Sequence, residues 1–90
     1  MKIIVTNLFL KFKKKSPKKI QLEIDNQIKK IVNNPEIGKI KKGNLTGIRI
    51  HKFTAGSQLL LLSYEYVKDV LYLYTIGSHE NFYKKLKRFL

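Results

Sequence analysis

Several residue types are absent or scarce in this chain of 90 residues, and each absence excludes a class of protein. There is no cysteine, which excludes a disulfide scaffold and a cysteine-ligated metal site. The six Asp and Glu residues are scattered, so a carboxylate Mg²⁺ site is not expected. The longest apolar run, Leu59–Leu62, is far short of the ~20 residues of a membrane span. Met1–Val5 runs straight into polar residues, unlike a signal peptide. We therefore expect a cytoplasmic protein with no membrane segment, metal or cofactor.

Positive charge is what the sequence has in excess. Lys and Arg total 19 against 6 Asp and Glu, which gives a formal net charge of +13. Apolar residues make up 43% of the chain, too many for an intrinsically disordered protein, and the length suits a single domain over residues 1–90. A basic domain of this kind is expected to bind an anionic partner, either nucleic acid or an acidic protein.

A short strand and two helices are predicted in the first third of the chain. The β-branched run Ile3–Val5 favours a strand, and Thr6 or Asn7 can cap a short helix after it. Ser16 followed by Pro17 is typical of the start of a second helix, with Ser16 as its N-cap. Apolar residues then recur at helical spacing up to residue 32, where an Asn-Asn-Pro sequence ends the helix. The two helices are expected to form an antiparallel hairpin.

Three strands and a final helix are predicted in the second half. A loop rich in Gly and Lys spans residues 35–47, and strands are expected at 48–53, 58–66 and 70–76. The middle one is nearly all apolar, which predicts a central strand buried on both faces. Ser78 can cap the last helix. The predicted fold is α+β, with order βααβββα: an antiparallel four-stranded sheet, the first strand at an edge, and the helices on one side.

Three stretches resemble the RelE/ParE superfamily of bacterial type II toxins. Residues 34–39 (Asn-Pro-Glu-Ile-Gly-Lys) and 45–49 (Leu-Thr-Gly-Ile-Arg) are similar to the family's passage between the second helix and the sheet. The three-strand meander is the second likeness. Residues 76–83 (Ile-Gly-Ser-His-Glu-Asn-Phe-Tyr) resemble the ending of RelE-like and YafQ-like members. The resemblance covers nearly the whole chain and implies a RelE-like fold with an N-terminal helical hairpin and a C-terminal helix.

The resemblance implies a small basic toxin that an acidic antitoxin holds inactive. RelE-like members cleave mRNA in the ribosomal A site without a metal, as endoribonucleases that stop translation. ParE-like members inhibit DNA gyrase without a catalytic group. We expect a ribosome-dependent mRNA endonuclease. Because the same fold supports both activities, we keep two alternatives: a gyrase inhibitor, and an inert relative that binds nucleic acid or antitoxin.

Histidine suits the proton transfers of RNA cleavage because its pKa lies near neutrality. His79 falls where YafQ-like members have a catalytic histidine, so the resemblance implies a general acid or base. Tyr83 would lie on the same helical face and stack on a base or hydrogen-bond near the phosphate. The alternatives are a surface histidine near the start of a helix and an aromatic that packs the helix on the sheet.

Two further catalytic candidates share one face of the first meander strand. If that face is the open side of the sheet, His51 and Arg49 line the same cleft as His79. The Arg49 guanidinium can bind a phosphate bidentately. The alternatives are a histidine at the edge of the core and an arginine that pairs with Glu65 or a backbone carbonyl. RelE-like members commonly have an arginine where this chain has Gln58, so one transition-state cation is missing.

Lysines are the expected phosphate contacts. They occur in the run between the first two helices, in the loop and on the first meander strand, and the candidates are Lys14, Lys15, Lys39, Lys41, Lys42 and Lys52. Such contacts position a nucleic acid without specifying its sequence. The expected partners are thus an acidic antitoxin and the ribosome with its mRNA.

Overall fold

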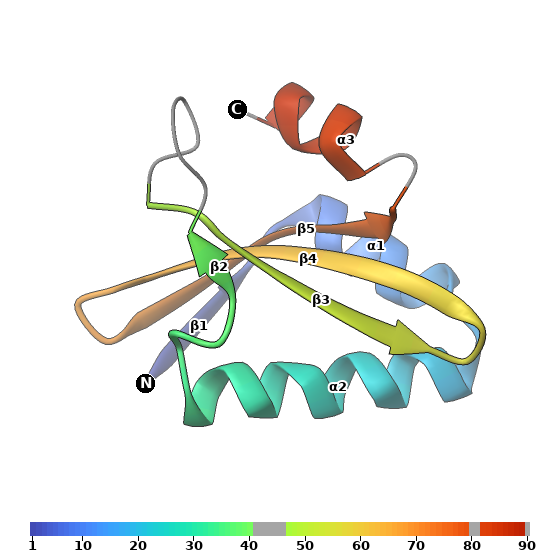
Figure 1. Ribbon diagram of the computed structural model, residues 1–90, viewed down its shortest axis with the longest axis horizontal. Coiled ribbons are helices and arrows are strands. Elements are labelled where there is room, and N and C mark those ends of the chain that lie inside the picture. Colours follow the sequence, from blue (N-terminus) through green and yellow to red (C-terminus); the bar gives the residue numbers. More distant parts are fainter. Residues whose placement is uncertain (41–46, 80–81, 90) are drawn as a thin grey trace.

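The computed structural model describes residues 1–40, 47–79 and 82–89, and side chains of α3 only at positions 82–84 and 86 (Figure 1). The elements follow in the order β1 (Lys2–Val5), α1 (Asn7–Lys15), α2 (Lys18–Asn33), β2 (Lys39–Ile40), β3 (Arg49–Ala55), β4 (Gln58–Val67), β5 (Val70–Ser78) and α3 (Phe82–Phe89). Within this part of the chain, none of the helices has the length and apolar character that a membrane span requires.

In the described residues, the sheet has five strands in the order β1-β5-β4-β3-β2. The antiparallel meander of β3, β4 and β5 and the edge position of β1 are confirmed. The prediction of a four-stranded, wholly antiparallel sheet is wrong in two respects. β1 pairs parallel to β5, which is possible because the residues between them form a long crossover. β2 lies in the predicted loop, because two residues carry no alternation that a sequence pattern can detect.

Helices cover both faces of the sheet, so the prediction of helices on one side is wrong (Figure 1). Alternate residues of β4 point to opposite faces, with Leu60 and Leu62 on one and Leu61 on the other, and this confirms the central strand buried on both sides. The larger core joins α1 and α2 to the sheet through Phe9, Ile24, Ile31, Phe53, Leu62, Tyr64 and Leu71. The smaller core joins α3 to the sheet through Ile48, Ile50, Leu61, Phe82 and Leu86.

The helix starts differ from the predictions in two places. Thr6 caps α1 as predicted, since its Oγ1 accepts a hydrogen bond from the Phe9 N–H at 3.2 Å. Ser16 is not the N-cap of α2; it ends α1, where its hydroxyl donates to the Phe12 carbonyl. Pro17 takes the N-cap position instead. Ser78 is the last residue of β5 and does not cap α3, because the strand runs longer than predicted and α3 begins only at Phe82.

The β4–β5 hairpin sets the position of the last strand. Lys68 and Asp69 both have positive φ, at 49° and 64°, as a two-residue type I′ loop requires. Further along, Leu62 pairs with Ile76 and Tyr64 pairs with Leu73, so β5 carries one extra residue there. This bulge shifts the alternation of β5 by one residue, so that Ile76 follows Leu71 and Leu73 into the larger core.

Candidate nucleic-acid interface

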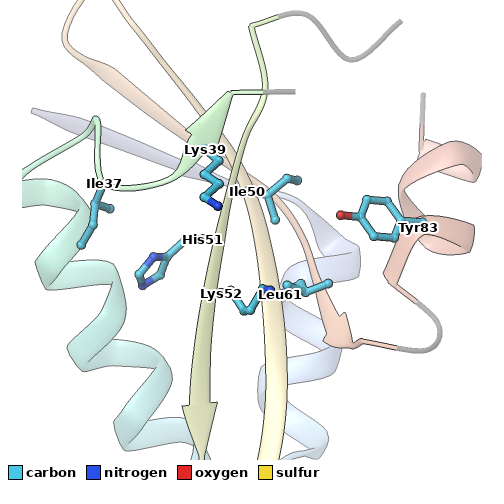
Figure 2. A pocket seen from close by; sticks show the side chains of 7 residues that line it. All are labelled: Ile37, Lys39, Ile50, His51, Lys52, Leu61 and Tyr83. Atoms are coloured by element: carbon cyan, nitrogen blue, oxygen red, sulfur yellow. The ribbon is translucent and has the colours of Figure 1, made fainter. Parts of the chain in front are cut away.

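A groove with a volume of about 580 Å³ lies over β2, β3 and β4 and is bordered by α3 (Figure 2). Ile50 and Leu61 come from adjacent strands and also belong to the smaller core, so the floor of the groove is apolar and fixed by packing. The remaining lining residues are Ile37, Lys39, His51, Lys52 and Tyr83. The groove therefore brings together four of the candidates from the sequence: Lys39, His51, Lys52 and Tyr83.

Two lysines and a tyrosine reach this groove from three different elements. Lys39 is held there because β2 pairs with β3, with Lys39 opposite Ile50. Lys52 lies two residues after Ile50, on the same face of β3, and is exposed. Figure 2 shows Lys39 and Tyr83 on opposite sides of Ile50, and Tyr83 is 38% exposed. Two ammonium groups beside an aromatic ring suit a phosphate with a neighbouring base.

His51 borders the groove, but its ring is turned toward α2, away from Tyr83 (Figure 2). It is only 8% exposed, and its Nε2 lies 2.7 Å from Gln27 Oε1. Gln27 Nε2 in turn donates to Glu23 Oε2 at 2.6 Å. Because a carboxylate can only accept, Gln27 must present its oxygen to His51, and His51 Nε2 is the donor. Burial and, to a lesser degree, the nearby charge of Lys30 lower the pKa of His51 below 6.5, which favours the neutral ring at pH 7.

The face of β3 that carries Arg49, His51 and Phe53 is thus the one that α2 covers, so the condition under which His51 and Arg49 would line one cleft with His79 is not met. The open side carries Ile50 and Lys52. Sequence alternation separates the two faces of a strand but does not reveal which face a helix covers.

Arg49 does not line the groove. Its Nη1 donates to the Gly38 carbonyl at 2.8 Å and, at a longer 3.4 Å, to the Glu36 carbonyl. Of the two roles considered from the sequence, this geometry matches the arginine that pairs with backbone carbonyls. Arg49 stands beside Tyr64, its partner across the β3–β4 ladder.

His79 is exposed in the turn that follows β5 and does not line the groove. The strand register still brings it near, because Leu61 in the groove floor pairs with Gly77, two residues before His79. Across two strand spacings and two residues, the His79 and Lys52 Cα atoms are separated by roughly 12 Å.

The remaining lysine candidates lie elsewhere or outside the described residues. Lys14 and Lys15 are exposed in the last turn of α1, and Lys15 borders a second groove of about 480 Å³ with Lys11, Phe12 and Gln58. This second groove shares no residue with the first. Lys41 and Lys42 fall outside the part of the chain that the structure describes.

Sequence patterns missed Gln27 and Tyr64 as residues that shape the site. Gln27 has a signal in the sequence, because it is a polar residue three positions after Ile24 on the buried stripe of α2. Tyr64 has none, because its hydroxyl finds its partners 26 and 29 residues away in the chain.

Comparison with solved structures finds the same fold in bacterial toxins. The isolated E. coli RelE toxin superimposes with a TM-score of 0.69 at 18% identity, covering 99% of this chain and 98% of that one. A chain of the intact E. coli RelBE toxin–antitoxin complex gives a TM-score of 0.69 at 14% identity, covering 86% and 94%. A conserved hypothetical protein of Helicobacter pylori gives 0.55 at 21% identity, covering 89% and 96%. At these identities the likeness establishes a shared RelE-like fold.

The comparison with curated protein sequences found no significant match. A family model is more informative, because the ParE-like toxin of type II bacterial toxin–antitoxin systems matches residues 3–87. The match covers nearly every described element, and the fold of RelE agrees with it. The resemblance seen in the sequence is therefore confirmed, and this chain belongs to the ParE-like toxins of type II bacterial toxin–antitoxin systems.

Proposed function

We propose that this chain is the toxin of a toxin–antitoxin pair and cleaves mRNA on the ribosome by metal-independent chemistry, with the groove beside α3 as its RNA-binding surface. One observation carries the proposal: Lys39, Lys52 and Tyr83 converge from three elements on one open face of the sheet. Two ammonium groups beside an aromatic ring can bind an RNA phosphate and stack on its neighbouring base.

The reaction begins when the 2′-hydroxyl of the RNA loses a proton and attacks the adjacent phosphate. A five-coordinate phosphorane with extra negative charge forms, and the 5′-oxygen then leaves with a proton. Lys39 and Lys52 are the cations of the groove that offset this charge, which develops only in the transition state. Tyr83 would hold a neighbouring base by stacking or bind the phosphate through its phenol.

One of these two proton transfers is assigned to His79, either as the general base that takes the 2′-hydroxyl proton or as the general acid that protonates the 5′-oxygen, and solvent water exchanges the other proton. Its ring is exposed in the turn after β5, where solvent and RNA both reach it. His51 is the less suitable candidate, because its Nε2–H is engaged with Gln27 and its ring faces α2. In this proposal His51 helps to hold the groove border against α2 and transfers no proton.

The proposal includes an acidic antitoxin as the inhibiting partner. The intact E. coli RelBE structure is a toxin–antitoxin complex on the same fold, and the net charge of +13 favours a negatively charged partner. An antitoxin that covers Lys39 and Lys52 would exclude RNA from the groove.

The test is to induce the toxin without antitoxin and map mRNA 5′ ends, with a gyrase supercoiling assay in parallel. The wild type is expected to give new 5′ ends within codons of translated messages and to leave supercoiling intact. His79→Ala is expected to abolish these ends, whereas His51→Gln is expected to retain them. Cuts that persist at the wild-type level in His79→Ala would remove His79 from the mechanism.

The second candidate is a gyrase inhibitor without catalytic chemistry. The observation that favours it is that neither histidine points into the groove: His51 is bound to Gln27, and His79 does not line the groove. This candidate predicts inhibited supercoiling, intact mRNA and little effect of either histidine substitution. If induction causes neither cleavage nor gyrase inhibition nor growth arrest, the chain is the inert relative.

A further inference from the structure

β2 is a short strand at the outer edge of the sheet. Among the residues that the structure describes, Lys39 and Ile40 are the two that pair with β3 on that side. An isolated pair of this length is marginal in water, so other contacts must fix the segment that carries Lys39. These contacts come from Tyr64 and Arg49, which stand side by side on β4 and β3.

Tyr64 fixes the segment by using its hydroxyl both as a hydrogen-bond donor and as an acceptor. The side chain is fully buried, and its hydroxyl donates to the Pro35 carbonyl at 2.6 Å while accepting from the Gly38 N–H at 2.9 Å. Burial raises the pKa of Tyr64 above 10.0, so the phenol keeps its proton and remains a donor. The ring is so close that a Cβ on Gly38 would lie 2.8 Å from it.

Arg49 completes the attachment from the neighbouring strand. Its Nη1 donates to the Gly38 carbonyl at 2.8 Å, so both backbone groups of Gly38 are bound by side chains. A charged donor makes a stronger bond than a neutral one. The next residue in the chain is Lys39, whose side chain enters the groove (Figure 2).

We propose that Arg49 and Tyr64 are positioning residues that act through Lys39: they lock Gly38 so that the Lys39 ammonium meets an RNA phosphate in the groove. This inference rests on the proposed function. It assigns Arg49 no direct contact with RNA. It also explains why the side chains of an arginine and a buried tyrosine both bind the backbone just before the short strand β2.

The test is a double-substitution cycle in single-stranded RNA binding at fixed salt. Tyr64→Phe keeps the ring and removes both hydrogen bonds. Tyr64→Phe and Lys39→Ala are each expected to weaken RNA binding about 3- to 10-fold. Combined with Lys39→Ala, neither Tyr64→Phe nor Arg49→Lys is expected to weaken binding further. Equal fold-losses in the two backgrounds would overturn the positioning role, because they would mean a direct contact or a general structural defect.

The matched control is Tyr66→Phe, because Tyr66 lies on the same strand and donates to Asp69 at an exposed site. It is expected to leave RNA binding unchanged. Hydrogen exchange gives an independent readout without RNA: the Gly38 amide should lose protection in Tyr64→Phe and keep it in Tyr66→Phe. If the exchange rate of the Gly38 amide is unchanged in Tyr64→Phe, the positioning role is overturned, but the groove can still be the RNA site. Full RNA binding by Lys39→Ala would instead overturn the groove as the RNA site.

Discussion

At the residue scale, Gly38 is held between the Tyr64 ring and the backbone of β3. A Cβ there would lie 2.8 Å from both Cε1 and the hydroxyl of Tyr64 and 3.1 Å from the Ile50 carbonyl. The buried ring cannot move aside without giving up its hydrogen bonds. Gly38→Ala is therefore expected to lower the free energy of unfolding by about 1–3 kcal/mol in urea denaturation and to weaken RNA binding.

The matched control is Gly56→Ala, at the β3–β4 turn. Gly56 has a φ of +63°, and its added Cβ would only touch Ile20 at 3.5 Å. The cost there is the left-handed backbone, about 1 kcal/mol, with no effect on the groove. If Gly56→Ala weakens RNA binding as much as Gly38→Ala, the contact with Tyr64 is not what matters.

His51 gives the protein a predictable pH dependence. Burial and Lys30 lower its pKa in the folded state below the ordinary 6.5. As the pH falls through 6.5, the unfolded chain takes up a proton that the folded chain does not. Stability is therefore expected to fall from about pH 7.5 downward and to level off below the folded pKa.

The pH effect is measured as the difference in unfolding free energy between wild type and His51→Gln, from pH 7.5 to 5. As the pH falls, the unfolding free energy of the wild type should decrease relative to that of His51→Gln. His79→Gln is the matched control, because it makes the same substitution at the histidine that lies exposed in the turn after β5. A wild-type slope retained in His51→Gln would assign the titration to another group.

The sequence predicts residues of the site better than their orientations. The alternation of β3 correctly separates Ile50 and Lys52 from Arg49, His51 and Phe53. Which set faces the open groove depends on where α2 packs, and this is a contact between distant segments. A backbone carbonyl is one of the Arg49 partners that the sequence suggests, but the sequence does not reveal that this carbonyl belongs to Gly38.

At the element scale, α3 is attached to the sheet by a core of its own. Phe82 and Leu86 are fully buried against Ile48, Ile50 and Leu61, while the larger core lies on the other face. Phe82→Ala with Leu86→Ala removes an attachment worth several kcal/mol. The amides of residues 83–89 are expected to lose protection in hydrogen exchange while those of β4 keep it.

Ile24→Ala is the matched control for this element, because Ile24 is fully buried in the larger core. It should lower protection throughout the sheet. If the two substitutions in α3 lower β4 protection to the same extent, the two cores unfold as one cooperative unit.

Elements with a clear sequence pattern are predicted, and the shortest strand is missed. The stripe of α2 and the apolar run of β4 give strong periodic signals, and both are confirmed. β2 has two residues and was missed. Ser16-Pro17 marks a true helix boundary. The serine ends α1 instead of starting α2, because its hydroxyl donates to the Phe12 carbonyl.

At the scale of the whole molecule, the charge of +13 makes RNA binding strongly dependent on salt. Each phosphate contact to a single strand adds about 0.7 to the slope of log K against log salt. Lys39→Gln with Lys52→Gln is expected to reduce that slope by about 1.4 in fluorescence anisotropy from 50 to 300 mM KCl. An unchanged slope would mean that the groove lysines touch no phosphate.

The general α+β architecture follows from the order of elements, and the RelE-like fold confirms it. The arrangement of helices on both faces does not follow, because it depends on which side of the sheet the chain crosses after β5. The choice between RNA cleavage and gyrase inhibition also does not follow, since one fold carries both.

The most direct measurement of the central claim is the rate of mRNA cleavage on programmed ribosomes at saturating toxin. Two double variants are compared. One carries Lys39→Gln and Lys52→Gln in the groove. The other carries Lys14→Gln and Lys15→Gln and removes the same charge from the last turn of α1. The groove pair is expected to lower the rate about 100-fold or more, while the α1 pair keeps it. Cleavage at the wild-type rate by the groove pair would contradict the account.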